Sequence, residues 1–171
     1  TDDSGAINDG WGASAAFLDF DRDGWLDLYV TNYMDLDEDQ VCRDEAGRQD
    51  FCGPDFPGQP DKLFRNRGDG TYEDVSVASG IAKASHAGLG VVCADFDDDG
   101  WIDIYVANDK DPNLLWINTG NGSFDDDGAM LGVAYSGHGR AEAGMGVTTA
   151  DPDEDGDLDI LVARMQPGGV T

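Results

Sequence analysis

Asp95-Phe96-Asp97-Asp98-Asp99-Gly100-Trp101-Ile102-Asp103 is the stretch that decides the fold of this chain of 171 residues. Its pattern, Asp-x-Asp-x-Asp-Gly-x-x-Asp, occurs again at residues 19–27 and 151–159. Carboxylates at alternate positions can converge on one point, and the glycine permits the turn that a Cβ would obstruct. The last Asp then closes the cage from the following strand. Oxygen ligands without sulfur or imidazole favour calcium over zinc or copper.

The sequence therefore predicts about three calcium ions, one in each copy of the loop. Each ion is expected to have four Asp ligands and one backbone carbonyl, at position seven of the loop. These ligands are Asp19, Asp21, Asp23, Trp25 (carbonyl) and Asp27; Asp95, Asp97, Asp99, Trp101 (carbonyl) and Asp103; and Asp151, Asp153, Asp155, Asp157 (carbonyl) and Asp159. A single copy could equally be an acidic turn that binds nothing, but three copies in the same context favour calcium.

An EF-hand loop begins in the same way, and it is the alternative to be tested. It needs a bidentate Glu at position twelve and a helix on either side. Position twelve is Val in all three copies, at Val30, Val106 and Val162. The residues that follow each glycine are rich in β-branched and aromatic types and too short for a helix. Each loop is therefore predicted to join two strands of a β-hairpin.

Internal repetition predicts an all-β fold made of propeller blades with four antiparallel strands each. In the clearest unit the strands are expected at 88–94, 102–108, 113–118 and 123–126, with the calcium loop between the first two. The predicted blades are residues 1–79, 80–131 and 132–171, and the third is partial. Blade 1 carries an insertion, residues 33–60, which has no clear periodicity and is expected to be a long loop on one rim.

About three blades are fewer than the roughly four to eight of a closed propeller. Both ends of the chain also fall within a repeat. The chain is therefore expected to be part of a larger propeller, completed by further blades from the same or another chain. A three-bladed domain on its own would leave sheet faces and edges exposed.

The charge of the chain limits its partners and its setting. A formal charge of −26, from 10 basic and 36 acidic residues, excludes nucleic acid and anionic membrane surfaces as the main partner. No apolar run approaches the ~20 residues of a membrane helix. Without metal, the carboxylates of each loop repel one another, so calcium binding and folding are expected to be coupled. Extracellular calcium modules bind at roughly 10⁻⁴ to 10⁻³ M, which favours an extracellular, periplasmic or cell-surface location.

The cysteines fit this setting. Cys42 and Cys52 lie in the insertion and could form a disulfide. The alternative is two free thiols or a metal pair, although zinc would need a further Cys or His. Cys93 lies on a predicted strand and is expected to be a buried thiol.

Catalysis has little support in the sequence. His86 and His138 occupy non-equivalent positions, and no motif places a Ser or Cys beside either. Paired carboxylates of the glycosidase type remain open, but the well-placed Asp residues are assigned to the loops. Trp25 and Trp101 share one loop position and could be sugar platforms, although packing is favoured.

The loop and the strand after it resemble the FG-GAP or VCBS-type repeats of integrin α-subunit propellers. Residues 63–75 are similar to units in bacterial and animal proteins of the cartilage-acidic-protein type. This resemblance implies a calcium-stabilised, usually secreted β-propeller that acts in adhesion or as a scaffold. We therefore expect a non-catalytic module for a protein or glycan partner, with specificity in rim loops such as 33–60. The alternative is the propeller portion of a secreted polysaccharide-degrading enzyme.

Overall fold

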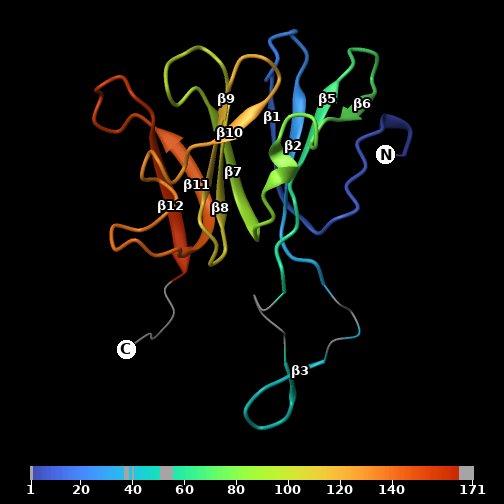
Figure 1. The fold of residues 1–171 in the computed structure, drawn as a ribbon, viewed down its shortest axis with the longest axis vertical. Helices are drawn as coiled ribbons and strands as arrows, with labels where there is room; N and C mark the ends of the chain where they lie inside the picture. Colours follow the sequence, from blue (N-terminus) through green and yellow to red (C-terminus); the bar gives the residue numbers. More distant parts are fainter. Residues whose placement is uncertain (1, 37–38, 40, 51–55, 166–171) are drawn as a thin grey trace.

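The computed structural model describes residues 2–36, 39, 41–50 and 56–165, and the repeats form separate antiparallel sheets (Figure 1). The first blade is β1 (Gly12–Leu18), β2 (Asp27–Asn32), β5 (Lys62–Asn66) and β6 (Tyr72–Asp74); the second is β7 (Gly88–Ala94), β8 (Asp103–Asn108), β9 (Leu114–Asn118) and β10 (Phe124–Asp126); the third is β11 (Ala143–Ala150) and β12 (Asp159–Met165). Four-stranded antiparallel blades are thus confirmed, and three of the predicted strands begin one residue later than expected. The boundaries drawn between blades stay predictions.

The three loop hairpins have one and the same register. Leu18 pairs with Asp27, Ala94 with Asp103, and Ala150 with Asp159, so each loop leaves and re-enters its sheet at equivalent positions. Each hairpin also has an irregularity near its open end, beside a glycine. The EF-hand alternative is excluded, because strands rather than helices flank the loops.

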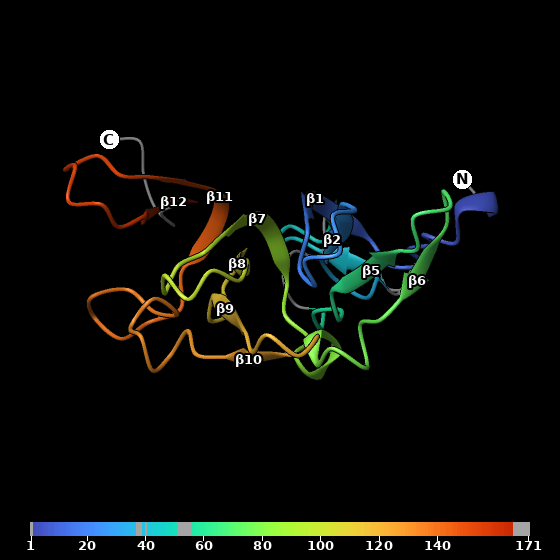
Figure 2. The ribbon, with the colours of Figure 1, turned by 90° about the horizontal axis from the view of Figure 1, so that it is seen from above.

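The first strands of the blades, β1, β7 and β11, lie side by side, and the outer strands β6 and β10 lie farther from them (Figure 2). Glycines permit this approach. A Cβ added to Gly88 would lie 3.1 Å from the Cβ of Thr31, and one added to Gly144 would lie 3.1 Å from the carbonyl oxygen of Asn108. Both contacts join one blade to the next, so larger side chains there would push neighbouring blades apart.

The core lies between the blades. Successive side chains of a strand point to opposite faces, so Ile104 and Val106 of β8 pack towards the first blade with Tyr29. Tyr105 and Ala107 pack on the other side with residues of β11 and β12. All six residues of β8 are buried, since the second blade is covered on both faces.

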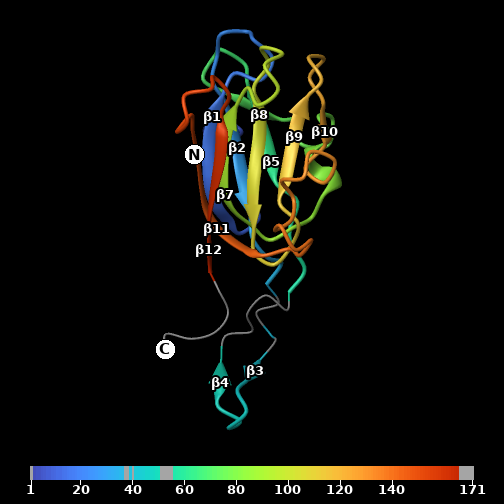
Figure 3. The same cartoon turned by 90° about the vertical axis from the view of Figure 1, so that its left-hand side faces the viewer.

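The insertion contains more structure than the sequence predicts. Two short strands, β3 (Cys42–Arg43) and β4 (Gln49–Asp50), form a hairpin whose turn carries an ion pair between Asp44 and Arg48. The hairpin extends from the end of the molecule opposite to the Asp-rich loops (Figures 1 and 3). The sequence predicts residues 33–60 as a long loop on one rim, and it does not predict these two short strands within it.

The described residues also form the 3-10 helices η1 (Asp2–Ser4) and η3 (Ile81–Lys83). No helix in the described ranges is long and apolar enough to cross a membrane. Cys52 lies outside the described residues, so the disulfide between Cys42 and Cys52 stays a prediction. Cys93 on β7 is a free, half-buried thiol, and burial raises its pKa to about 12.

Candidate metal centres

Each Asp-rich loop brings three carboxylates together. One oxygen from each member of a group lies within 4.8 Å of the others. The groups are Asp19, Asp21 and Asp27 in the first loop, Asp95, Asp97 and Asp99 in the second, and Asp151, Asp153 and Asp155 in the third. Of the other predicted Asp ligands, Asp23, Asp103 and Asp159 fall outside these groups.

The three loops share an unusual backbone. Position four is left-handed although it is not glycine, with φ of 59° at Arg22, 58° at Asp98 and 60° at Glu154. Position six is the glycine, and φ at Gly24 is 89°. No atom lies within 4 Å of a Cβ added there, so the glycine is needed for its dihedral angle and not for space. The repeated strain indicates that one geometry is required in all three loops.

Backbone amides already bind part of each carboxylate group. The N–H of Gly24 donates to Oδ2 of Asp19 at 3.1 Å, and the N–H of Gly100 donates to Oδ2 of Asp95 at 2.8 Å. The other oxygen of Asp95, Oδ1, is buried and has no hydrogen-bond partner. A buried carboxylate oxygen without a donor is costly unless a cation compensates for it. The second loop therefore has an orphaned ligand atom that fits a bound metal ion.

The ninth residue of the loop has a second role that the sequence analysis missed. Asp27 is fully buried and accepts the N–H of Phe20 on Oδ2, at 3.1 Å, and that of Asn66 on Oδ1, at 2.8 Å. Asp103 repeats this with Phe96 and Asn118. The carboxylate thus joins the loop to the third strand of its own blade. Each oxygen keeps a further lone pair, so this role is compatible with metal binding.

The two Asn partners also bind the backbone through their side chains. Nδ2 of Asn66 donates to the carbonyl of Leu26 at 2.9 Å. Nδ2 of Asn118 reaches across to the first blade and donates to the carbonyl of Phe20, also at 2.9 Å. The recurrence of Asn at the last position of the third strand was the available signal. The first and second loops are therefore tied together by Asn118.

Burial, and then the charges of neighbouring carboxylates, raise the pKa of several Asp side chains in the loops. Burial is the main cause that raises the pKa of Asp27 to about 6, and the charges of Asp21 and Asp23 raise it further. Asp103 is likewise raised to about 6, mainly by burial. The pKa of Asp21 is raised by burial first and then by the neighbouring charge of Asp23. A divalent cation would relieve this repulsion, because it stabilises the ionised carboxylates.

The third loop departs from the other two at its second residue. Phe20 and Phe96 donate an N–H to the ninth Asp, but the equivalent residue is Pro152, which has no N–H to donate. Asp159 is exposed, in contrast to Asp27 and Asp103. The ninth Asp of the third loop is therefore held less firmly within the described part of the chain.

Trp25 and Trp101, whose carbonyls are predicted ligands, pack within their blades. The indole of Trp25 lies against Gly68, where an added Cβ would be 2.8 Å from Nε1, and Trp101 lies in the same way against Gly120. The guanidinium of Arg22 covers the Trp101 ring at 4.3 Å from its centroid. These contacts account for both tryptophans through packing and a cation–π contact between neighbouring loops.

The two histidines are not brought to the loops. Nδ1 of His86 lies 3.1 Å from the carbonyl oxygen of Pro112, at a connection between strands. Among the described residues, His138 makes no hydrogen bond or ion pair with a nucleophile or a carboxylate. Neither histidine therefore adds a catalytic arrangement to the candidate sites.

Comparison with known proteins agrees with this architecture. A sequence model of the FG-GAP-like repeat matches residues 44–106 and 95–162. Cartilage acidic protein 1 of Mus musculus is 31% identical over 152 residues, which are 88% of this chain and 21% of that protein. Its Homo sapiens counterpart is 34% identical over 114 residues, which are 65% of this chain and 16% of that protein. The chain thus spans about a fifth of the length of the mouse relative.

Proposed function

This chain belongs to the FG-GAP-like repeat family, and we propose that it is a calcium-binding, non-catalytic module of an extracellular β-propeller. The observation that carries the proposal is the geometry of the loops. Three segments far apart in the sequence hold the same left-handed backbone at two positions and gather three carboxylates each. The buried, unpartnered Oδ1 of Asp95 supports a cation as the missing partner.

The donor set fits calcium. Carboxylate and carbonyl oxygens suit a hard cation, and the flexible, many-oxygen arrangement suits calcium better than the strict octahedron of magnesium. Calcium would supply the positive charge that balances the carboxylates at the end of each blade. The first and second loops are also held by protein residues, because Asp27 and Asp103 join each loop to the third strand of its blade.

The proposed role of calcium is to stabilise the blades. All three loops lie at one end of the molecule (Figure 1), and the insertion hairpin β3–β4 lies at the other. The end that carries the metal ligands is therefore separate from the rim that carries the insertion. We propose that a protein or glycan partner is bound through rim loops such as this one, in a scaffold or adhesion role.

An extracellular, periplasmic or cell-surface location follows from the proposed calcium affinity. Sites built from exposed carboxylate loops suit calcium concentrations of roughly 10⁻³ M, which are found outside cells. The charge of −26 favours the solubility of the module and disfavours its binding to anionic surfaces.

Thermal unfolding tests the calcium proposal. A ligand at 100 times its Kd stabilises the folded state by about 2.7 kcal/mol per site. For a chain of this size each 1 kcal/mol shifts Tm by about 2–4 °C. EDTA should therefore lower Tm by about 5–10 °C per site, and calcium should restore it while magnesium restores less. An unchanged Tm in EDTA would refute calcium binding.

A single substitution tests whether the loops bind independently. Asp97→Ala removes a carboxylate of the second group, and the number of calcium ions bound should fall from about three to about two by isothermal titration calorimetry. Asp98→Asn is the matched control, because Asp98 belongs to the same loop but to none of the carboxylate groups. This variant should keep the stoichiometry of the wild type. Equal losses in both variants would mean that general charge, and not a defined site, attracts the ion.

A further inference from the structure

The Asp-rich loops of the first two blades are in contact through Arg22 and Trp101. Arg22 is position four of the first loop, and its Cζ lies 4.3 Å from the centroid of the Trp101 ring, at position seven of the second loop. The guanidinium also lies against Gly100, where an added Cβ would meet its Nη2. A side chain of the first loop therefore covers the residue whose carbonyl is a predicted ligand of the second.

A chain of buried hydrogen bonds joins the same two loops. Oδ2 of Asp27 accepts the N–H of Phe20 at 3.1 Å, and the carbonyl of Phe20 accepts a hydrogen bond from Nδ2 of Asn118 at 2.9 Å. The backbone N–H of Asn118 then donates to Oδ1 of Asp103 at 2.8 Å. All four residues are buried, where hydrogen bonds are strong. Asp27 and Asp103 are the predicted ninth-position ligands, so the chain leads from one proposed metal centre to the next.

Arg22 has two alternative sets of partners. It stands between Asp21 and Asp23 in the sequence, and free carboxylates attract a guanidinium. In the structure Arg22 covers Trp101 instead. Once the carboxylates of the first loop are bound to a cation, they no longer compete for Arg22, and its place on Trp101 is favoured. Trp101 is thereby held, and its N–H donates to Oδ1 of the predicted ligand Asp99 at 2.8 Å. Order in the first loop thus favours the ligand geometry of the second.

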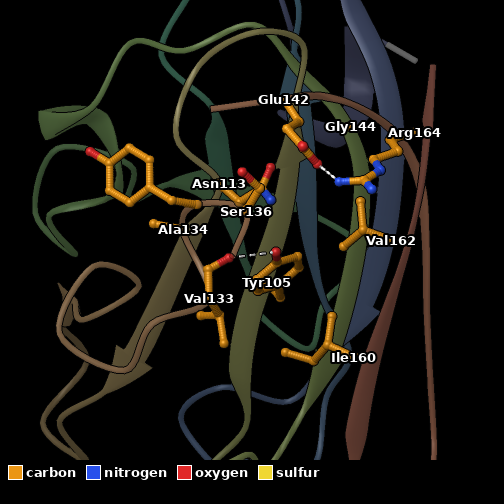
Figure 4. Close-up of a pocket in the computed structure, with 11 residues that line it drawn as sticks. Tyr105, Asn113, Val133, Ala134, Ser136, Glu142, Gly144, Ile160, Val162 and Arg164 are labelled. Carbon is orange, nitrogen blue, oxygen red and sulfur yellow. Dashed lines mark hydrogen bonds and ion pairs between the residues drawn. The ribbon is translucent and has the colours of Figure 1, made fainter. Parts of the chain in front are cut away.

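The second and third loops make no such contact in the part of the chain that the structure describes. The residues at the corresponding positions, four and seven, are Asp98 and Asp157, two acids that cannot form a cation–π contact. On this side of the second blade the hydroxyl of Tyr105 donates to the carbonyl of Val133 at 3.0 Å, outside the loops (Figure 4). The third loop is therefore an internal control for the first.

We propose that calcium binding in the first and second loops is positively coupled, with Arg22 and Asn118 as the link. An ion in the first loop raises the affinity of the second, and an ion in the second raises that of the first by the same factor. This inference rests on the proposed calcium function. It concerns affinity and not the number of sites, so each loop still binds its own ion.

Terbium luminescence can report the second loop alone. Tb³⁺ binds to the oxygen ligands that calcium takes, and it emits when a tryptophan beside it is excited. Trp25→Phe, introduced in every variant, removes the tryptophan of the first loop, and the third loop has Asp157 at this position. The emission then follows the ion beside Trp101.

Asp21→Ala and Asp153→Ala form the matched pair. Each removes the third-position carboxylate of a loop that neighbours the second one, so both remove the same charge. We expect Asp21→Ala to weaken Tb³⁺ binding at the second loop by about fivefold or more. Asp153→Ala should leave this affinity within about twofold, since no link of this kind joins the second and third loops. Equal effects of the two variants would overturn the proposal.

Arg22→Asn separates a link from a simple charge effect. Asn tolerates the left-handed backbone at this position, where φ is 59°. A guanidinium that only repelled cations would, when removed, leave the second loop with stronger Tb³⁺ binding. Removal of a link should instead weaken binding by about two- to fivefold, which corresponds to one exposed cation–π contact. Arg43→Asn, in the insertion hairpin, removes the same charge far from the loops and should have no effect. Stronger or unchanged binding in Arg22→Asn would overturn the proposal.

Calorimetry with calcium distinguishes failure of the coupling from failure of the calcium function. About three ions bound to the wild-type chain, together with equal effects of Asp21→Ala and Asp153→Ala, would overturn the coupling alone. Absence of bound ions would overturn both proposals. Circular dichroism in excess calcium checks that each variant folds. Should Asp21→Ala unfold, Arg22→Asn decides the matter, because it keeps every carboxylate of the loops.

Discussion

The backbone N–H of Asn118 lies 2.8 Å from Oδ1 of Asp103, and both residues are buried. The bond joins the end of β9 to the start of β8, directly below the second Asp-rich loop. Oδ2 of the same carboxylate accepts the N–H of Phe96 at 2.9 Å. One side chain therefore joins the loop, the second strand and the third strand of the blade.

Asp103→Asn tests this role. An amide offers one oxygen where the carboxylate offers two, so a buried N–H loses its acceptor. We expect a loss of about 1–3 kcal/mol in the free energy of unfolding, measured by urea denaturation. Asp98→Asn is the control, because Asp98 is exposed and Asn tolerates its left-handed backbone.

The same measurement in EDTA separates the two roles of Asp103. If the carboxylate holds the strands together, Asp103→Asn remains less stable than the wild type after the metal is removed. A difference that disappears in EDTA would show that Asp103 acts only as a calcium ligand.

Gly24→Ala tests the strain in the first loop. A Cβ at this position meets no atom within 4 Å, so the whole effect comes from φ of 89°. We expect a loss of about 1–2 kcal/mol in unfolding free energy, from the cost of a left-handed L-residue. Gly146→Ala is the matched control, since it also has open space but no positive φ. Equal losses in the two variants would show that the left-handed dihedral angle of Gly24 is not the cause.

The raised pKa of Asp61 predicts that the stability of the protein depends on pH. Burial raises the pKa of Asp61 to about 7 in the folded protein, from the ordinary value of 3.8. The folded state therefore keeps this proton between about pH 4 and pH 7, where the unfolded chain has released it. The free energy of unfolding should fall as the pH rises through this range and level off above it.

Asp61→Asn should remove this contribution, and the second blade supplies the template. Oδ1 of Asp61 accepts the N–H of Asn32 at 2.8 Å, and Oδ1 of Asn113 accepts the N–H of Asn108 in the same way at 2.9 Å. Urea denaturation in calcium at pH 5 and pH 8 should show a smaller difference for Asp61→Asn than for the wild type. Asp125→Asn, at an exposed position, should keep the difference of the wild type. If Asp61→Asn kept the pH dependence of the wild type, Asp61 would not be the source of that dependence.

The hairpins and the blade topology could be predicted from the sequence because they follow from a repeated local pattern. The loop glycines mark turns, and the segments after them alternate or run apolar over strand lengths. The antiparallel order of the second blade then follows from short connections between its strands.

The contacts between distant residues could not be predicted in the same way. Asn118 follows Asp103 by 15 residues, but Asn66 follows Asp27 by 39, since the insertion separates them. Because the two spacings differ, the sequence does not reveal that both pairs make the same hydrogen bond. Arg22 and Trp101 belong to different blades, and their contact depends on how those blades pack. The strands of β3–β4 are two residues each, too short for an alternating pattern to appear.

Gly88 and Gly144 have a consequence for the geometry of the assembly. Each lies where one blade approaches the next, and an added Cβ would lie 3.1 Å from an atom of the neighbouring blade, closer than ordinary van der Waals contact. The second and third blades are therefore thin where these glycines face the preceding blade, and this thickness affects the angle between neighbouring blades. Since that angle determines how many blades complete a circle, two residues without side chains help to set the curvature of the array.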